Sequence, residues 1–248
     1  MSSCCVTGFN WDGKPSGKEE KIAGLNTYVA GSNSDVAILM IHDVFGWTFT
    51  NLRLLADHFA KEVNATVYLP DFFGGEVIEP AMLSDPAKRG QFDLMAFIGR
   101  NTKEIRYPEI EKTARELKES KGYKKIGTIG YCYGGWAVFQ LGAKGKGLVD
   151  CISTPHPSLL TKEEIDAVGV PVQILAPEHD PQYTAELKEH SLKVIPTLGV
   201  DFDYQYFPGI AHGFAAKGDK NDPKQKAALE RAKNSAVAWF SQYLHLNA

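Results

Sequence analysis

The chain has 248 residues, a hydrophobic content of 44% and a charged content of 23%, values typical of a soluble globular protein. A formal net charge of −3 gives no electrostatic reason to expect a nucleic-acid partner, and four cysteines in a chain this long do not form a disulfide scaffold. No stretch approaches the ~20 apolar residues of a membrane span, and residues 1–17 hold no apolar run typical of a signal peptide. We therefore expect a cytoplasmic protein with reduced thiols and no membrane partner.

The predicted elements form a single α/β domain over residues 1–248, because strands alternate with helices along most of the chain. Residues 25–30 alternate apolar and polar side chains like an outer strand, whereas residues 36–41 are continuously apolar like a central parallel strand. Periodicity fails between residues 72 and 101, whose aromatic and methionine content indicates part of the wall over a site. Further strands are predicted at 65–69, 126–131, 149–154, 170–175 and 202–207. Helices are predicted at 52–63, at 108–119 with Pro108 in the first turn, from 137 onward, and after the capping sequence Asp222-Pro223-Lys224-Gln225.

Cys132 lies where a predicted strand becomes a helix, between Gly130 and Gly134. This is the nucleophile-elbow pattern G-x-S-x-G with sulfur in place of oxygen. Glycines at these positions let backbones approach closely, and the helix N-terminus behind the turn stabilises negative charge on the sulfur or on a nearby oxyanion. Gly-rich strand-to-helix turns also bind phosphates, and a free cysteine is commonly a small buried hydrophobe, so the pattern alone leaves these alternatives open.

A catalytic triad at such an elbow needs an acid and then a histidine, each following a later strand. Asp180 follows the predicted strand at 170–175, and His212 follows the strand at 202–207. The chain order is therefore nucleophile, acid, histidine, as this architecture requires. We predict that Cys132, Asp180 and His212 form a triad.

These residues and their neighbours resemble the dienelactone hydrolase family (carboxymethylenebutenolidases), Cys-His-Asp members of the α/β-hydrolase superfamily. The resemblance covers most of the chain, and the cysteine at the elbow is its specific part, because most superfamily members carry serine there. Three further segments are similar to fungal members of the family: Cys4-Cys5, Thr7-Gly8 and Thr154-Pro155-His156-Pro157-Ser158. The segments that carry the resemblance are His42-Asp43-Val44-Phe45-Gly46, Pro70-Asp71-Phe72-Phe73, Gly130-Tyr131-Cys132-Tyr133-Gly134-Gly135, Asp180 and Ala211-His212-Gly213-Phe214.

The resemblance implies an α/β-hydrolase fold, with a mostly parallel central sheet and helices on both faces. It also implies cleavage of an ester or lactone bond of a small molecule, in which Cys132 attacks the carbonyl, His212 takes the thiol proton and water releases the acid from a thioester. The oxyanion donors in this superfamily are two backbone N–H groups, here those of Val44 and Tyr133. No metal or organic cofactor is implied, and the sequence contains no Walker or dinucleotide fingerprint.

Asp43 and His156, near the expected site, each allow two interpretations, and Cys4 and Cys5 near the start of the chain indicate no chemical role. Asp43 stands where similar proteins often carry glutamate near the nucleophile, so it holds the thiol protonated or is a loop carboxylate that ends the strand. His156 follows the strand at 149–154, so it orients substrate or is a loop histidine between two prolines. Cys4 and Cys5 suit neither a zinc knuckle nor a mutual disulfide, and we expect free thiols in a docked N-terminal arm.

Bacterial family members bind a substrate carboxylate with arginines, one of them four residues after the triad histidine. That position is Ala216 here, and the nearest cation is Lys217, a flexible point charge that does not replace the bidentate fork of arginine. We therefore predict that neutral, apolar or aromatic esters and lactones are preferred over the anionic dienelactone. Arg89 and Arg100 either supply a second cationic contact or are solvated surface residues. The predicted substrate contacts are Asp43, Phe45, Trp47, Phe72, Arg89, Phe92, Arg100, His156, Phe214 and Lys217.

Three other functions share parts of this pattern. A non-catalytic small-molecule binding protein on the same fold would not need all three triad residues. A redox pair of Cys132 with Cys151 is disfavoured, because Cys151 falls near the start of a different buried strand. A lyase or isomerase acting on a lactone or polyketide-like substrate would use the same residues, because fold and triad do not fix the reaction. We expect a monomer or a homodimer.

Overall fold

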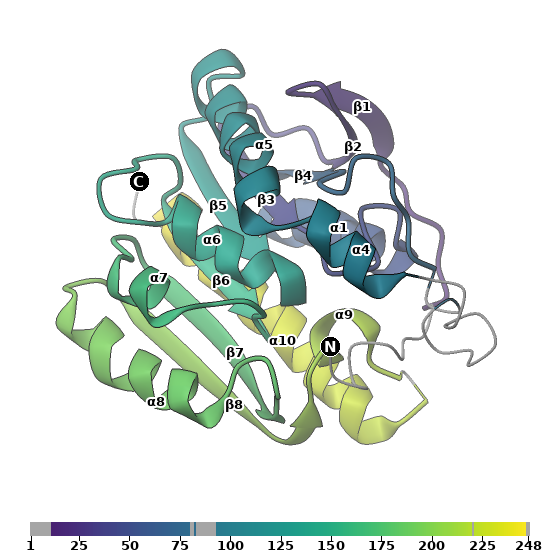
Figure 1. The fold of residues 1–248 in the computed structure, drawn as a ribbon. Helices are drawn as coiled ribbons and strands as arrows, with labels where there is room; N and C mark the ends of the chain where they lie inside the picture. Colours follow the sequence, from purple (N-terminus) through teal and green to yellow (C-terminus); the bar gives the residue numbers. More distant parts are fainter. Residues whose placement is uncertain (1–10, 80–81, 83–92, 220, 247–248) are drawn as a thin grey trace.

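The structure is a computed structural model that describes residues 11–79, 82, 93–219 and 221–246. An eight-stranded sheet runs through these residues in the order β1-β2-β4-β3-β5-β6-β7-β8 (Figure 1). β2 pairs antiparallel with both β1 and β4, and all other neighbours pair in parallel, so the predicted mostly parallel sheet is confirmed. The strands are β1 (Lys18–Ile22), β2 (Leu25–Ala30), β3 (Val36–Ile41), β4 (Thr66–Pro70), β5 (Lys125–Gly130), β6 (Cys151–Pro155), β7 (Val172–His179) and β8 (Phe202–Ala211).

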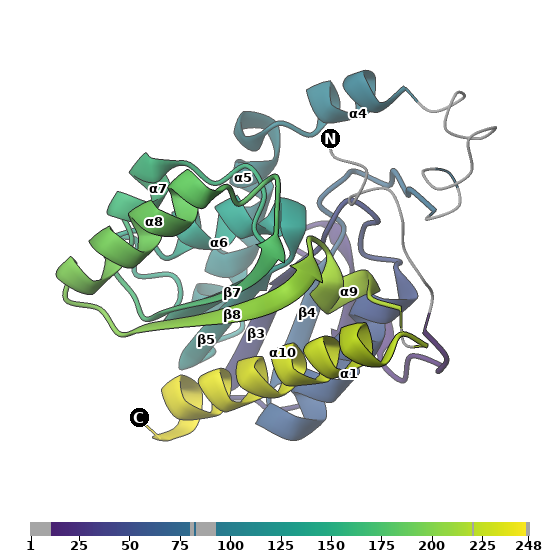
Figure 2. The ribbon, with the colours of Figure 1, turned by 90° about the horizontal axis from the view of Figure 1, so that it is seen from below.

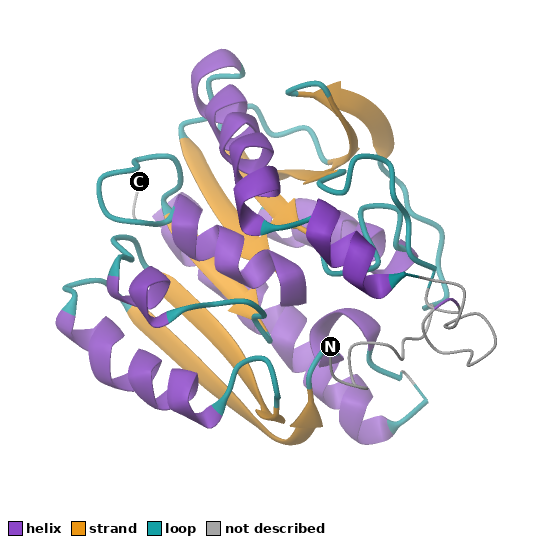
Figure 3. Cartoon of the chain, in the orientation of Figure 1, coloured by secondary structure: helices purple, strands orange, loops and turns teal. Residues whose placement is uncertain are grey.

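Helices cover both faces of the sheet, as Figures 2 and 3 show. One face carries α1 (Thr50–Val63) and α10 (Pro223–Ser241), which pack against each other. The other face carries α5 (Lys103–Arg115), α6 (Gly135–Leu141), α7 (Lys162–Asp166) and α8 (Ala185–Val194). The remaining helical elements are α4 (Leu94–Arg100), α9 (Phe214–Lys217), the 3-10 turns Cys132–Gly134 and Ile195–Thr197, and the π-helical turns Glu116–Ser120 and Gln242–Leu246.

The burial of each strand follows its place in the sheet. β3 is a continuous apolar run whose every residue is buried, because β4 and β5 flank it and helices cover both faces. At one edge, β1 was not predicted: its sequence Lys-Glu-Glu-Lys-Ile is charged and largely exposed. It nevertheless pairs with β2 from Lys18 opposite Val29 to Ile22 opposite Leu25. Charged side chains on an edge strand hinder its pairing with other chains, and they also remove the apolar periodicity that sequence analysis relies on.

Helix α5 begins at Lys103, five residues before its predicted start, so Pro108 lies inside the helix and not in its first turn. The prediction rested on the preference of proline for the first helical turn, where a backbone N–H has no partner within the helix and its absence costs no hydrogen bond. Contacts with α6 explain the longer helix. The Lys103 ammonium lies 5.4 Å from the centre of the Trp136 ring, and the centre of the Tyr107 ring lies 6.2 Å from it.

The segment at 72–101, predicted to be irregular, contains helix α4 in its described part. Asp93 caps this helix by accepting a hydrogen bond from the Ala96 N–H at 2.9 Å, and Phe97 is buried against the Phe73 ring at 4.9 Å. Seven residues are too few to display a helical period in the sequence. The predictions for Arg89 and Phe92, like those for Cys4 and Cys5, fall outside the described residues.

Strands β7 and β8 each run four residues further than predicted and end directly before Asp180 and His212. Each extension contains a proline, Pro177 in β7 and Pro208 in β8. Pro208 lies on the edge strand, where a missing N–H need not break the ladder, and the register shifts between Pro177 and His179. Both predicted triad partners therefore lie at the carboxyl ends of neighbouring parallel strands. None of the helices described between residues 11 and 246 combines the length and apolar character that a bilayer crossing requires.

Candidate active site

Cys132 occupies a sharp turn between β5 and α6 with a φ of 48°, a left-handed backbone conformation that residues with side chains rarely adopt. Both flanking glycines are required by close approach. A Cβ at Gly130 would collide with the Gly134 carbonyl oxygen, and a Cβ at Gly134 would collide with the Ile41 carbonyl oxygen. This strained turn is the geometry of a nucleophile elbow, which presents its side chain at the top of the sheet.

His212 and Asp180 form a fully buried pair. His212 Nδ1 lies 2.8 Å from Asp180 Oδ1, and both side chains have no exposed surface. A carboxylate only accepts hydrogen bonds, so Nδ1 carries the proton and donates. Asp180 Oδ1 also accepts from the backbone N–H groups of Gln182 at 2.8 Å and Tyr183 at 3.0 Å, which fix the carboxylate. The bond at Nδ1 therefore sets the orientation of the imidazole, and Nε2 is the ring nitrogen on the opposite side.

The Ser158 hydroxyl contacts both the thiol and the imidazole. Its Oγ is 3.3 Å from Cys132 Sγ and 3.4 Å from His212 Nε2, and only 5% of the residue is exposed. Ser158 belongs to the segment that resembles fungal members, but its residue type predicted no role. The only available signal was a hydroxyl residue shortly after the end of a central strand, where parallel sheets place their sites.

A cavity of about 420 Å³ opens beside the thiol. Both predicted oxyanion donors belong to it: Val44 and Tyr133 line the same cavity as Cys132. Its apolar wall comes from α4 and from the loop after β6, and the charged residues among its described lining are one lysine and one glutamate. The lining residues are Val44, Phe97, Ile98, Asn101, Thr102, Lys103, Glu104, Cys132, Tyr133, Ser158, Leu159, Thr161 and Gln182.

Asn101 holds the wall helix α4 against the elbow, a role that sequence analysis missed. The Tyr133 hydroxyl donates to the Asn101 carbonyl oxygen at 2.9 Å, and burial raises the pKa of Tyr133, so the hydroxyl stays protonated. The Asn101 side chain donates to the Phe97 carbonyl oxygen at 2.9 Å and accepts from Arg106 Nε at 2.8 Å. The residue that supplies a predicted oxyanion N–H thus also anchors the cavity wall.

The structure places three predicted aromatic contacts in the core and not in the cavity wall. Trp47 stacks under the Arg53 guanidinium at 4.7 Å, Phe72 lies 5.8 Å from the His42 ring, and Phe214 lies 4.7 Å from the Phe207 ring. Aromatic side chains are common both in protein cores and at binding sites, so residue type alone did not indicate that these three pack in the core.

The predicted charged contacts also lie elsewhere. Arg100 is half exposed and pairs with Glu76 at 2.7 Å. Lys217 is buried, runs across Gly213 and lies 5.8 Å from the centre of the Phe45 ring. It lines a separate hollow with His212, and neither it nor Arg100 nor Phe45 is among the described residues that line the cavity at Cys132.

His156 is completely buried, and neither of its ring nitrogens has a hydrogen-bond partner among the described residues. Its ring packs edge-on against His212 at 5.0 Å and Phe214 at 5.6 Å. Burial, followed by the nearby His212 and Lys217, lowers the pKa of His156 well below its ordinary value, so the ring is neutral. His156 supports the His212 imidazole from behind, and the structure does not place it in the cavity wall.

Asp43 is nearly buried, and its Oδ1 accepts a hydrogen bond from the Phe45 N–H at 2.9 Å. This bond shapes the loop that carries Val44. The neighbouring His42 joins that loop to the one after β4: its Nδ1 donates to the Asp43 carbonyl oxygen at 2.8 Å, and its Nε2 accepts from the Phe72 N–H at 3.0 Å. The bond accepted at Nε2 requires the neutral ring, and burial lowers the pKa of His42 to about 4.

We expect acid to destabilise the protein through His42. In the unfolded chain the ring binds a proton near pH 6.5, whereas in the folded chain it does so only near pH 4. The unfolded state therefore holds more protons between these values, and the stability present above pH 6.5 falls as the pH drops, by about 3 kcal/mol for this one group. The measurement is the free energy of urea unfolding at pH 7, 6 and 5.

The substitution His42→Gln should flatten this dependence by up to about 1.4 kcal/mol per pH unit, because one linked proton is lost. The matched control is His58→Gln, since the His58 side chain is 57% exposed on α1. Equal pH dependence of the wild type and His42→Gln would show that His42 does not carry the linkage.

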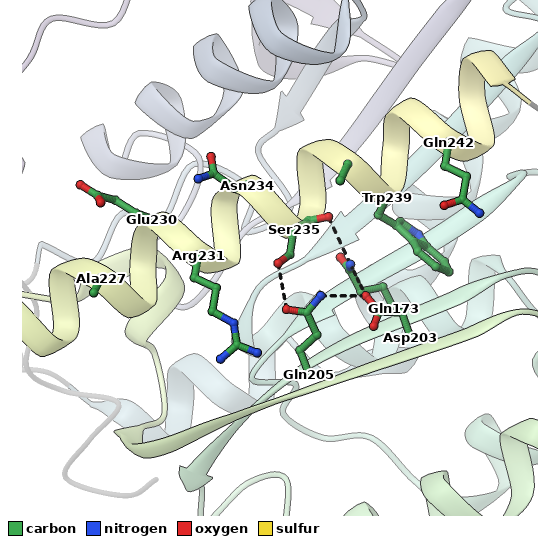
Figure 4. Close-up of a pocket in the computed structure, with 11 residues that line it drawn as sticks. Gln173, Asp203, Gln205, Ala227, Glu230, Arg231, Asn234, Ser235, Trp239 and Gln242 are labelled. Atoms are coloured by element: carbon green, nitrogen blue, oxygen red, sulfur yellow. Dashed lines mark hydrogen bonds between the residues drawn. The ribbon is translucent and has the colours of Figure 1, made fainter.

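Outside this cavity, the described residues form a larger hollow but no cluster suited to a metal. The hollow, about 670 Å³, lies between α10 and the strands β7 and β8 (Figure 4). Its polar side chains bond one another: Asp203 accepts from Gln173 at 2.8 Å and from Gln205 at 3.0 Å. Among the described residues, no group of three or more His, Cys, Asp or Glu side chains is placed to hold a metal ion.

Comparison with known proteins agrees with this architecture. A model of the dienelactone hydrolase family matches residues 25–244 of the chain. The chain is 30% identical to the hydrolase pyvD of Aspergillus violaceofuscus, with 98% of this chain and 97% of the relative covered. It is also 30% identical to the hydrolase tropI of Talaromyces stipitatus, with 98% and 96% covered. Its fold is similar to that of a dienelactone hydrolase from Anabaena variabilis, with a TM-score of 0.67 and 14% identity over 94% of this chain and 99% of that one.

Proposed function

This protein belongs to the dienelactone hydrolase family and is a carboxylic ester or lactone hydrolase, and we propose that it works through a Cys132–His212–Asp180 triad and a thioester intermediate. The observation that carries the proposal is the convergence of three strand ends. The elbow after β5 holds the thiol, and the buried His212–Asp180 pair, 2.8 Å apart, comes from the ends of β8 and β7. A nucleophile, a base and a group that orients the base are the parts that acyl transfer requires.

In the first half of the reaction, the Cys132 sulfur attacks the carbonyl carbon while its proton moves to His212 Nε2. Asp180 keeps the imidazole in the tautomer that can accept this proton and stabilises the imidazolium that forms. Val44 and Tyr133 line the same cavity as the thiol, and their N–H groups receive the oxyanion. Each such donor contributes a factor of ~100 to 1,000 in rate.

In the second half, His212 returns the proton to the leaving alcohol and then activates water, which hydrolyses the thioester. A ring-opened hydroxy acid is the product when the substrate is a lactone. The hydrogen bond from the Tyr133 hydroxyl to the Asn101 carbonyl oxygen fixes Tyr133, so the oxyanion donor need not reorganise during turnover.

Product analysis in heavy-oxygen water tests this function. We expect neutral aryl esters and lactones to yield acids that carry one heavy oxygen, and quenched mixtures to contain the chain acylated at Cys132. Cys151→Ala is the matched control, because burial raises the pKa of that thiol well above its ordinary value and leaves it unreactive. Products without heavy oxygen would indicate a lyase or isomerase and contradict the proposal.

The cavity favours an apolar acyl group. Phe97 and Ile98 of α4 and Leu159 of the loop after β6 line it, and Leu159 is 48% exposed at its rim. Lys103, the cation among the described lining residues, is already paired, with its Nζ 2.7 and 2.9 Å from the two Glu164 carboxylate oxygens. A substrate carboxylate would therefore compete with Glu164 for this ammonium.

We expect a dienelactone acid to be turned over with a kcat/KM no more than ~100-fold above that of its neutral methyl ester. The reason is that a dedicated buried cation would contribute about 3 kcal/mol to such a preference, and the described lining residues offer none that is unpaired. Lys217→Gln should leave the ratio unchanged, because Lys217 lines a different hollow. A larger preference for the acid, lost in Lys217→Gln, would show that Lys217 reaches the substrate.

A further inference from the structure

The hydroxyl of Ser158 lies within hydrogen-bonding distance of both atoms that must exchange a proton. Its Oγ is 3.3 Å from Cys132 Sγ and 3.4 Å from His212 Nε2, and the residue is 95% buried by the surrounding chain. A hydroxyl is one donor and an acceptor at the same time, so it can bond to both groups in either protonation state. A methyl group or a valine side chain at this place could bond to neither.

The backbone fixes this hydroxyl in place. The Ser158 N–H donates to the Cys132 carbonyl oxygen at 2.8 Å, and the His156 N–H donates to the Leu175 carbonyl oxygen at 3.0 Å. The residues on both sides adopt left-handed backbone conformations, with φ of 41° at His156 and 59° at Leu159. Strain of this kind persists only where the surrounding structure over-determines it, and it is concentrated at functional sites.

The loop is also wedged against the elbow. Thr154 Oγ1 donates to the Gly130 carbonyl oxygen at 2.9 Å, and a Cβ at Gly135 would collide with Pro157. The elbow and the loop after β6 are therefore one packed unit, which fixes Ser158 relative to the thiol. This preorganisation is what a group needs if it is to act at the reacting atoms.

We propose that Ser158 is a further catalytic residue, whose hydroxyl passes the proton between the Cys132 thiol and His212 Nε2 and then donates a hydrogen bond to the thiolate. The inference rests on the proposed function of the site. In the forward step the S–H bond breaks as Ser158 Oγ takes its proton, while the original Ser158 O–H proton passes to Nε2. Serine ends as a neutral hydroxyl, the sulfur as a thiolate and His212 as an imidazolium, so charge and protons balance.

The relay has a specific consequence for the resting enzyme. A thiolate and an imidazolium on either side of a hydroxyl are bridged by two charge-assisted hydrogen bonds, which are about twice as strong as neutral ones. Ser158 therefore raises the fraction of reactive thiolate before substrate binds, and it does so independently of the oxyanion N–H groups.

The test compares the wild type with Ser158→Ala and Ser158→Thr. We expect Ser158→Ala to lower the rate of Cys132 alkylation by iodoacetamide at pH 7 and the kcat/KM for an aryl ester by about 100-fold, the lower range for general acid–base catalysis. Ser158→Thr keeps a hydroxyl on the same carbon and should recover most of both rates. The proton inventory of kcat in mixed light and heavy water should be bowed in the wild type, because two protons move together, and linear in Ser158→Ala.

Ser153→Ala is the matched control for loss of a buried serine hydroxyl. Ser153 is fully buried on β6, and its Oγ donates to Gln173 Oε1 at 2.8 Å. In Ser153→Ala, iodoacetamide should alkylate Cys132 at the wild-type rate. The relay would be overturned if Ser158→Ala were alkylated at the wild-type rate and kept a bowed proton inventory. It would also be overturned if Ser158→Ala and Ser158→Thr lost alkylation rate and kcat/KM to the same extent. Hydrolysis that survives in Cys132→Ala would instead overturn the proposed function, so the two failures are distinguishable.

Discussion

Cys132→Ala is expected to abolish hydrolysis and to leave the protein folded. Removing one sulfur from a side chain that is 6% exposed at the cavity wall opens a small void, which costs of order 1 kcal/mol or less. Alanine keeps the Cβ of cysteine, so the strained φ of 48° is no harder to adopt. The measurement is the initial rate with a neutral aryl ester, together with the thermal midpoint to confirm folding.

Cys151→Ala should retain full activity in the same assay, because Cys151 is completely buried in β6. Activity that persists in Cys132→Ala at the wild-type level would remove the nucleophile from the mechanism. Activity lost in both variants, with unchanged thermal midpoints, would contradict the assignment of the thiol to the elbow alone.

Asp180→Asn is expected to reduce kcat by ~10⁴, the cost of the same change in a serine triad. Asn can keep the fold, because its carbonyl oxygen still accepts from the N–H groups of Gln182 and Tyr183. The same oxygen position lies 2.8 Å from His212 Nδ1, so an amide with its oxygen there leaves the imidazolium without a counter-charge. An amide turned the other way presents its NH₂ to Nδ1 and favours the wrong tautomer. Rapid-quench measurement of thioester formation separates this loss from any change in substrate binding.

Glu178→Gln is the matched control for loss of a nearby carboxylate. Glu178 is exposed, and its side chain accepts from the Gly209 N–H at 2.5 Å, so we expect less than a few-fold change in rate. If Asp180→Asn stayed within a few-fold of the wild type, a carboxylate other than Asp180 would have to orient His212.

The parts of the site that could be predicted are those whose constraints are local. Gly130 and Gly134 mark the elbow because no other residue tolerates the backbone approach there. The order of Cys132, Asp180 and His212 places each after a separate strand of a parallel sheet, and the structure puts these strand ends at one edge. Continuous apolar runs such as β3 were predicted to the residue, because burial on both faces leaves a strong pattern.

The parts that could not be predicted depend on which long-range neighbour a side chain meets. Ser158 acquires its place from a loop path set by a backbone bond to Cys132, 26 residues away, and no sequence pattern encodes such a bond. Phe72 and Trp47 have the chemistry of cavity residues but found partners in the core. Asn101 braces the wall through its main chain and its amide, and its residue type alone indicates neither contact.

The position of β8 has a consequence for how the site comes into being during synthesis. β8 is the last strand among the described residues and an edge of the sheet, and His212 follows it directly. A nascent chain emerges N-terminus first, so the elbow, the Val44 and Tyr133 N–H groups and Asp180 all leave the ribosome before β8 can pair with β7. The proposed base is therefore the last component delivered, and a chain interrupted before residue 202 carries the thiol without the group that activates it. We therefore expect activity to begin only after β8 has paired with β7 and positioned His212.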